Sequence, residues 1–265
     1  MARRHGGHVV SVPTAEEIMT FVAARAVRDG QVCLVGHGIP AAAAHLARRL
    51  HAPAAVVVHE SGAVDVRLRD DDPLTDATVA DRALTHVTLG SLYGEWLQAG
   101  RVDLGFVGHV PGAQLDRYAN IGSSVVGEYD EPTERLPGPG AAAEIAAWAG
   151  ETVIVVRHRL QAFVEQVDFV TAVGHGTGPL DRALLGLRGR GPVRVVTDLG
   201  VLEPDPQTAE LVLTAVHPGI DVEQVRAETG WDLQVAPDVR TTPEPTGTEL
   251  AALRTLRPAS TEESP

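Results

Sequence analysis

The amino-acid sequence predicts an α/β fold built on a largely parallel sheet that is flanked by helices. Short runs of small or β-branched residues are typical of strands that are buried on both faces of such a sheet. Two of these runs, at residues 32–35 and 54–58, are each followed by a turn that contains glycine. The order strand, turn, helix and strand occurs at least twice along the chain, which favours right-handed parallel connections.

Capping and turn residues mark the expected elements in the first half of the chain. Thr14 is a favourable N-cap for a first helix, and Glu17 occupies the capping-box position. Pro40 suits the first turn of a second, alanine-rich helix. The expected elements are a helix at 15–28, a strand at 32–35, a helix that ends at 50, a strand at 54–58, a polar loop at 67–76, a helix at 89–99 and a strand at 102–107.

The second half of the chain continues the same alternation without a Pro/Ser-rich linker. Residues 112–120 contain too little glycine for a linker and too many polar groups for a core segment. We therefore expect one domain over residues 14–258, a loose arm at 1–13 and a disordered tail at 259–265. The expected elements are a helix at 141–149, strands at 152–156, 193–197 and 211–216, a helix at 222–229, a short strand at 232–235 and a helix at 246–256.

Composition and charge exclude several classes of partner. The net charge is −13 and no basic stripe offsets it, which argues against binding to nucleic acid or to an anionic membrane. Cys33 is the only cysteine, so neither a disulfide nor a cysteine-based metal site can form within the chain. No stretch reaches the roughly 18 apolar residues of a membrane span, and no apolar segment follows Arg3-Arg4 as an export signal requires. We expect a cytoplasmic protein.

Glu60 is the first candidate for a catalytic residue. It directly follows the apolar run at 54–58 and precedes Ser61-Gly62, where the chain must turn tightly. Ligands of open α/β sheets bind just beyond the carboxyl ends of the strands. A carboxylate at that position can act as a base or a nucleophile. The alternative is a solvated residue at the end of a strand, because position in a fold does not fix function.

Three other features are candidates for binding sites, and each has a plainer alternative. Gly36-His37-Gly38 lies between a strand and a helix and can cradle an anion, although both glycines can serve the turn alone. Arg157-His158-Arg159 can meet a phosphate or simply end a charged strand. Asp70-Asp71-Asp72 lacks the spacing of a calcium loop and is more typical of a solvated loop.

Histidine is abundant, but its distribution does not indicate a metal site. None of the eleven histidines belongs to an H-E-x-x-H motif or to a close cluster with aspartate. No G-x-S-x-G motif is present, so a serine hydrolase has little support. Several histidines lie beside glycine turns or strand ends, where we expect hydrogen-bonded loop residues: His37, His59, His109, His175 and His217.

Taken together, the motifs and their order resemble one known family. The motifs are G-x-G-x-P from Gly36, V-x-E-S-G around Glu60, G-A-Q-x-D-x-Y-x-N from Gly112, and later V-T-D-L-G, H-P-G and T-G-W-D. Their arrangement over about residues 14–258 resembles the beta subunit of family I CoA-transferases, most closely the glutaconate CoA-transferase type.

This resemblance implies the fold, the partner and the chemistry. It implies the α/β fold of the CoA-transferase superfamily, a separately encoded alpha subunit, and acyl-CoA and a carboxylic acid as substrates, with no tightly bound cofactor. It implies that Glu60 is the nucleophile and forms a glutamyl-CoA thioester. It further places the oxyanion and CoA-binding backbone at Gly36, Gly38, Gly140 and Ala141, and the substrate pocket at Ser61, Gly62, Gln114 and Asn120.

The sequence also departs from the family pattern near the expected site. Ala141 occupies the place of the second glycine of a Gly-Gly pair, where a positive φ would be less comfortable. Ala119 and Gly122 stand where the family commonly has Gly and Asn, and residues 109–111 are extra. These changes affect the expected substrate and oxyanion geometry and leave the assignment of Glu60 intact.

Two other functions are compatible with the same resemblance. Relatives in steroid degradation use this scaffold for hydrolytic ring opening of a CoA thioester, but their beta subunits do not keep the glutamate of E-S-G, so Glu60 favours transfer. Ligand-sensing regulators of the superfamily are not catalytic and usually carry a DNA-binding segment. This acidic chain shows no basic helix-turn-helix at either end.

Overall fold

The computed structural model describes residues 12–108 and 111–256. The arm expected at residues 1–13 lies almost entirely outside these residues, and the tail expected at 259–265 lies wholly outside them. The extra residues His109 and Val110 are also outside the described part of the chain.

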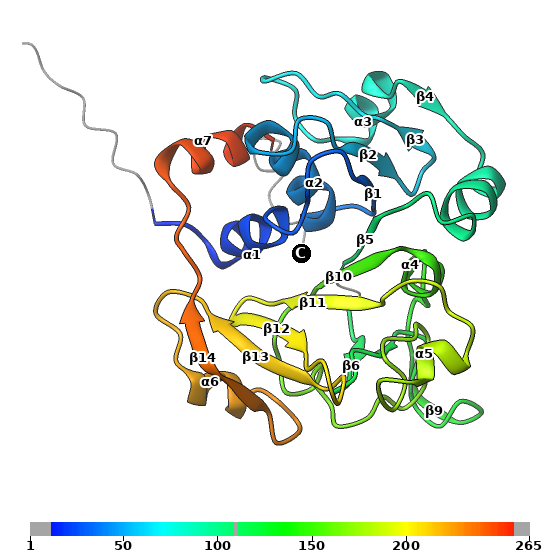
Figure 1. Ribbon diagram of the computed structural model, residues 1–265, viewed down its shortest axis with the longest axis vertical. Helices are drawn as coiled ribbons and strands as arrows, with labels where there is room; N and C mark the ends of the chain where they lie inside the picture. Colours follow the sequence, from blue (N-terminus) through cyan, green and yellow to red (C-terminus); the bar gives the residue numbers. More distant parts are fainter. Residues whose placement is uncertain (1–11, 109–110, 257–265) are drawn as a thin grey trace, which may run out of the picture.

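A ten-stranded sheet organises the described residues (Figure 1). Its five central strands run parallel, and antiparallel strands extend it on both sides, which confirms the expected α/β fold with a largely parallel sheet. In spatial order the strands are β14 (Gln234–Thr241), β13 (Leu211–Val216), β12 (Gly200–Pro204), β11 (Pro192–Val196), β10 (Glu151–Val155), β5 (Leu104–Val107), β1 (Val32–Val35), β2 (Val56–His59), β3 (Ala63–Val64) and β4 (Thr85–His86).

Helices cover both faces of the sheet because successive strand residues point to opposite faces. Cys33 and Val35 of β1 belong to the core beneath α1 (Ala15–Ala24), α2 (Ile39–Leu50) and α7 (Gly247–Leu256), whereas Leu34 belongs to the core on the opposite face. Figure 1 shows α1, α2 and α7 gathered beside β1 and β2. The opposite core contains residues of η1 (Ser91–Gln98), α4 (Ala142–Trp148) and α6 (Val222–Ala227).

Smaller elements border this main sheet. The helix α3 (Asp76–Arg82) packs through Val79 against Ala63 and Val66 near β3. Two short hairpins and one short helix complete the described part of the chain: β6 (Gln114–Leu115) with β7 (Ile121–Gly122), β8 (Val125–Gly127) with β9 (Pro132–Arg135), and α5 (Asp181–Leu184).

Most expected elements are present, with several changes at their ends. The capping box of Thr14 and Glu17 forms as predicted, but α1 ends at Ala24 instead of residue 28. There Ala26 and Val27 donate to carbonyls only three residues back, which tightens the chain ahead of the turn at Gly30. The expected helix at 89–99 is a π-helix, and the expected strand at 232–235 is the longer β14.

Among the described residues, no helix combines the length and the apolar composition needed to cross a membrane.

Candidate active site

The turns that follow three parallel strands meet at one edge of the sheet. Gly36 follows β1, Glu60 follows β2 and Gly108 follows β5, and these strands are neighbours in the order β5-β1-β2. The turn at 137–141, which leads into α4, faces them across a cavity of about 370 Å³. The wall of this cavity is completed by His37, Phe106, Val107, Ala142 and Ile145.

Glu60 lies in this cavity because the backbone pairing of β2 continues past the last strand residue. Its N–H donates to the carbonyl of Val35 at 3.0 Å, which aligns Glu60 with the turn after β1. Its carboxylate lies against Gly36, where an added Cβ would be 3.2 Å from Oε2 and 3.4 Å from Oε1. Gly36 has no Cβ, so it leaves space for the Glu60 carboxylate as well as forming the turn after β1.

The turn after Glu60 depends on Gly62. This glycine has a φ of 91°, and an added Cβ would collide with the carbonyl oxygen of Val87. Its N–H closes the turn on the carbonyl of His59 at 2.9 Å. Neither Ser61 nor Gly62 belongs to the wall of the Glu60 cavity, so both contribute to the described site through the turn that presents Glu60.

The glycine turn before α4 shows how this chain accommodates Ala141. Positive φ values occur at Gly138 and Gly140, which have φ of 94° and 50°, while Ala141 is right-handed with a φ of −87°. The alanine is therefore unstrained at this position. Strain falls instead on Ala119, whose φ of 58° is unfavourable for a residue with a Cβ. Glycine, which the family commonly has at residue 119, would adopt this φ without strain.

The predicted CoA-binding residues divide between two cavities. Gly36, Gly140 and Ala141 line the cavity of Glu60. Gly38 lines a neighbouring cavity of about 200 Å³ beneath α3, and His37 contributes to both cavities.

Gln114 and Asn120, which were expected in the substrate pocket, do not line the Glu60 cavity. The side chain of Gln114 donates to the carboxylate of Asp168 and accepts from its N–H, both at 3.0 Å. Asn120 is 3% exposed, and its amide donates to Asp116 and to the carbonyl of Gly176 while its oxygen accepts from two N–H groups. In this chain their polar atoms hold neighbouring segments together.

His37, which lies beside Glu60, and Asp76, which contacts His37, were not identified as site residues from the sequence. His37 Nε2 is 3.9 Å from Glu60 Oε1, and His37 Nδ1 is 3.3 Å from Asp76 Oδ1. The parallel pairing of β1 with β2 is the signal that predicts His37 near Glu60, because both residues follow paired strand ends. No local pattern places Asp76 there, since α3 reaches the site only through packing around Val79.

A buried histidine pair lies directly behind Glu60. His59 is 4% exposed and His45 of α2 is 2% exposed, and their Nε2 atoms are 3.0 Å apart. Burial is the main cause that lowers the pKa of His59 to about 4, and His37 lowers it further. Burial and the neighbouring His59 lower the pKa of His45 well below its usual value. His59 lines the neighbouring cavity that contains Gly38, and this histidine pair carries no charge near neutral pH. Tyr93 of η1 is another titratable residue near Glu60. Burial and the charge of Glu60 raise the pKa of Tyr93.

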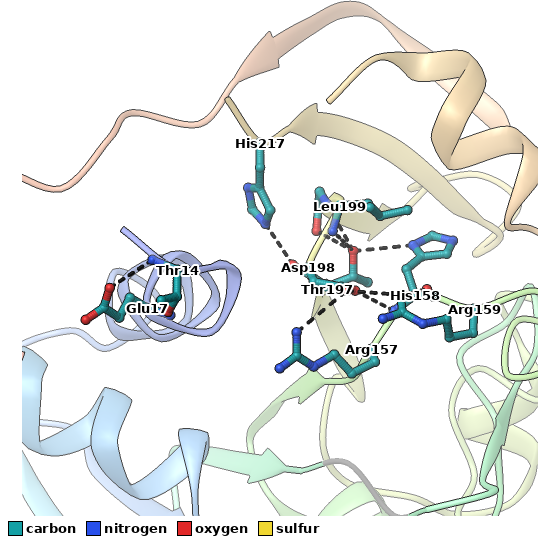
Figure 2. Close-up of polar contacts among 10 residues, drawn as sticks. Thr14, Glu17, Arg157, His158, Arg159, Thr197, Asp198, Leu199 and His217 are labelled. Atoms are coloured by element: carbon teal, nitrogen blue, oxygen red, sulfur yellow. Dashed lines mark hydrogen bonds and ion pairs between the residues drawn. The ribbon is translucent and has the colours of Figure 1, made fainter. Parts of the chain in front are cut away.

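The basic segment after β10 forms ion pairs within the chain. Figure 2 shows Arg157 and Arg159 directed toward Asp198, with N–O distances of 3.7 and 3.0 Å. Burial alone would raise the pKa of Asp198, but hydrogen bonds from the His158 N–H and from Arg159 lower it. This pairing supports the plainer interpretation of a charged strand end, and phosphate binding at this segment stays a prediction.

The remaining metal candidates are occupied by other contacts. His158 contacts Thr197 and Thr229, and His217 contacts Thr242 and the carbonyl of Thr197. Asp72 of the acidic loop pairs with Arg82, with one N–O distance of 2.6 Å. Within residues 12–108 and 111–256, no group of three or more His, Cys, Asp or Glu side chains is arranged to hold a metal ion.

Comparison with known proteins gives consistent matches. The Coenzyme A transferase family profile matches residues 17–228. The chain is 43% identical over 249 residues to the beta subunit of 3-oxoadipate CoA-transferase from Pseudomonas knackmussii, covering 93% of this chain and 94% of the relative. It is 35% identical over 234 residues to the beta subunit of glutaconate CoA-transferase from Acidaminococcus fermentans, covering 84% and 85%.

A solved structure gives the same result for the fold. The crystal structure of glutaconate coenzyme A-transferase from Acidaminococcus fermentans aligns with a TM-score of 0.83 at 31% identity, covering 92% of this chain and 95% of that one. The chain therefore belongs to the coenzyme A transferase family, as a beta subunit of the glutaconate CoA-transferase type within family I.

Proposed function

We propose that this beta subunit supplies the nucleophile of a heteromeric acyl-CoA:carboxylate CoA-transferase, and that the nucleophile is the carboxylate of Glu60. The observation that carries the proposal is the position of this carboxylate. It lies at the carboxyl edge of the parallel strands, partly exposed in a cavity and facing a glycine turn. Such a group is accessible to a thioester and is held on one side by the backbone of Gly36.

The reaction follows from carboxylate chemistry. A Glu60 oxygen attacks the thioester carbonyl of acyl-CoA, the C–S bond breaks, and a mixed anhydride and CoA thiolate form. The thiolate attacks the Glu60 carbonyl carbon, which releases the first carboxylic acid and leaves CoA on Glu60 as a thioester. The acceptor carboxylate then attacks that thioester, and the same steps run in reverse. The acyl activation is conserved without ATP.

Each of these steps develops negative charge on a carbonyl oxygen. Backbone N–H groups that are fixed in advance stabilise such charge by a few kcal/mol. In the described part of the chain, the N–H groups of Gly140 and Ala141 donate to no protein acceptor, and both residues line the Glu60 cavity. We propose these two N–H groups as oxyanion donors and Gly36 and Gly38 as further parts of the CoA-binding backbone.

The substrate and the partner are proposed from the relatives. The relative from Pseudomonas knackmussii is named for 3-oxoadipate, so 3-oxoadipate is the first acceptor acid to test. Both matched relatives are beta subunits, and we propose that an alpha subunit completes the acyl and acceptor pocket. Coenzyme A enters as part of a substrate and not as a resident cofactor. We further propose that residues 14–258 act as one domain, supported by the continuous sheet.

Trapping the intermediate tests this function. The complex with the alpha subunit is incubated with acyl-CoA in the absence of an acceptor acid, digested and examined by mass spectrometry. We expect CoA on the peptide that contains Glu60, and no adduct after Glu60→Gln, because an amide is a poor nucleophile. Asp70→Asn, a change at an exposed carboxylate of the acidic loop, is the matched control and should keep the adduct.

The same experiment separates transfer from ring-opening hydrolysis. A hydrolase consumes water, needs no CoA adduct and exchanges no CoA between free acids. Turnover of an authentic acyl-CoA by Glu60→Ala at the wild-type rate would show that Glu60 only ends a strand.

A further inference from the structure

The imidazole of His37 lies between two carboxylates that come from different elements. Its Nε2 is 3.9 Å from Oε1 of Glu60, which follows β2, and its Nδ1 is 3.3 Å from Oδ1 of Asp76, the first residue of α3. The ring also contributes to the walls of both neighbouring cavities, so it separates the Glu60 cavity from the cavity beneath α3.

His37 is the basic group that faces Glu60 in the described part of the chain. No other His or Arg nitrogen of these residues lies within 4.0 Å of the Glu60 carboxylate. His59 precedes Glu60 but is buried, and its pKa of about 4 keeps it neutral in the physiological range. Tyr93, from η1, has a raised pKa and keeps its proton. Among the described residues, His37 is therefore the basic side chain placed to act on the proposed nucleophile.

The arrangement restricts the carboxylate from two sides. Oε2 lies against Gly36, where even a Cβ would be in close contact at 3.2 Å. On the other side, Oε1 faces His37 Nε2. On the far side of the ring, Nδ1 is 3.3 Å from Oδ1 of Asp76, so an ion pair there favours the ring orientation that directs Nε2 at Glu60. Contacts of this kind lower the rotational freedom of a nucleophile before its substrate binds.

We propose that His37, held by Asp76, is a positioning residue for Glu60. The inference rests on the proposed role of Glu60 as the nucleophile. When both ring nitrogens carry a proton, Nε2–H attracts Oε1 and orients the carboxylate.

Single-turnover kinetics of the complex with the alpha subunit test the proposal. The readouts are the rate of CoA adduct formation on Glu60 and the KM for acyl-CoA. We expect His37→Leu to slow adduct formation about tenfold with KM changed by less than about twofold. His37→Gln keeps a donor near Oε1 and should retain part of the rate.

Asp76 acts through His37, which a double-mutant cycle can detect. Asp76→Asn alone should slow adduct formation about threefold, and it should have no further effect in the His37→Leu background. Asp71→Asn, an exposed acid in the preceding loop, is the matched control and should behave as the wild type.

Several results would overturn the inference. They are a wild-type rate of adduct formation for His37→Leu, a rise in KM that accounts for the whole loss, or an equal effect of Asp76→Asn in both backgrounds. Glu60→Ala in the same assay separates this failure from failure of the proposed function. If Glu60→Ala abolishes the adduct while the His37 variants are unaffected, only the positioning role is wrong. If Glu60→Ala transfers CoA at the wild-type rate, the nucleophile is wrong.

Discussion

The carboxylate of Glu60 packs against the backbone of Gly36, so closely that an added Cβ on Gly36 would lie 3.2 Å from Oε2 and would displace the carboxylate. The contact arises from the parallel register of β1 and β2, in which Val35 is paired with His59. The next residue of each strand is thereby brought to the same edge of the sheet. The absence of a Cβ at Gly36 thus determines how Glu60 is presented to the cavity.

Gly36→Ala should displace the carboxylate without disturbing the fold. Gly36 does not have a positive φ, so alanine can adopt its backbone conformation, but the new Cβ would contact Oε2 at 3.2 Å. We expect adduct formation on Glu60 to slow by roughly tenfold or more and the melting temperature to change little. Gly178→Ala, at a position with open space around it, is the control. A wild-type rate for Gly36→Ala would contradict this role of the contact.

Gly38→Val tests the second glycine of the same turn. Gly38 has a φ of 74° and a ψ of −136°, a conformation that a β-branched residue rarely adopts. We therefore expect valine to lower stability by about 1–3 kcal/mol. If Gly38 also lies beside bound CoA, the folded variant should show a raised KM. Urea unfolding and kinetics at a temperature where the variant is folded measure the two effects separately. An unchanged KM would show that Gly38 serves the turn only.

The fold could be predicted from the sequence where local patterns determine it. The strands β1, β2, β5, β10 and β13 consist mainly of apolar residues, a composition typical of strands in a buried sheet. The strands β3, β4 and β12 were not predicted, because they are short or begin with glycine and form only by pairing with a partner. For example, β12 pairs antiparallel with both β11 and β13.

The same division applies to the candidate site. Glu60 and Gly36 were expected from motifs at strand ends, and the turn at 138–141 was expected at the site because of the family resemblance. All three line one cavity in the structure. The pairing of His37 with Asp76 depends on where α3 packs, which no local spacing encodes. Asn120 was expected in the pocket because the family resemblance implies that position, and this stays a prediction. In the described structure, the amide of Asn120 bonds to backbone groups of neighbouring segments.

Asn120→Ala should therefore lower stability more than it changes binding. The substitution removes the acceptor of the N–H groups of Gly174 and Gly176, whereas the carboxylate of Asp116 keeps the backbone donors of residues 118 and 120. We expect a loss of about 2–4 kcal/mol in the free energy of unfolding, since unsatisfied buried groups cost about 1–3 kcal/mol each. Urea denaturation measures the loss. A stable variant with a much higher KM for the acid substrate would support the pocket assignment instead.

The free energy of unfolding should decrease as the pH falls below the pKa of histidine in the unfolded chain. The pKa of His59 is lowered by burial to about 4, and burial is also the main cause that lowers the pKa of His45. Between about pH 6.5 and 4 the unfolded chain binds protons that the folded pair does not, so the free energy of unfolding decreases over this interval. His158, whose pKa is also about 4, adds to the same trend.

A substitution in the His45–His59 pair measures how much this pair contributes to the pH dependence of stability. His45→Leu removes one buried titrating group, and the loss of stability between pH 7.5 and pH 5 should be smaller than in the wild type. Urea unfolding at both pH values measures the difference. An equal loss in both proteins would mean that His45 does not contribute.

Catalysis should require the alpha subunit, because this chain surrounds Glu60 only in part. The carboxylate retains about a third of its exposure and His37 retains about two thirds, although both lie in the candidate active site. An exposed carboxylate is stabilised by water and is a weaker nucleophile than one in an enclosed site. We expect the purified single chain to form no detectable CoA adduct and to transfer no CoA. Co-expression with the alpha subunit should give a stable complex on size-exclusion chromatography, with both activities present. The single chain with Glu60→Ala is the blank for any contaminating activity. Robust transfer by the wild-type chain alone, absent from that blank, would show that this chain already contains a complete site.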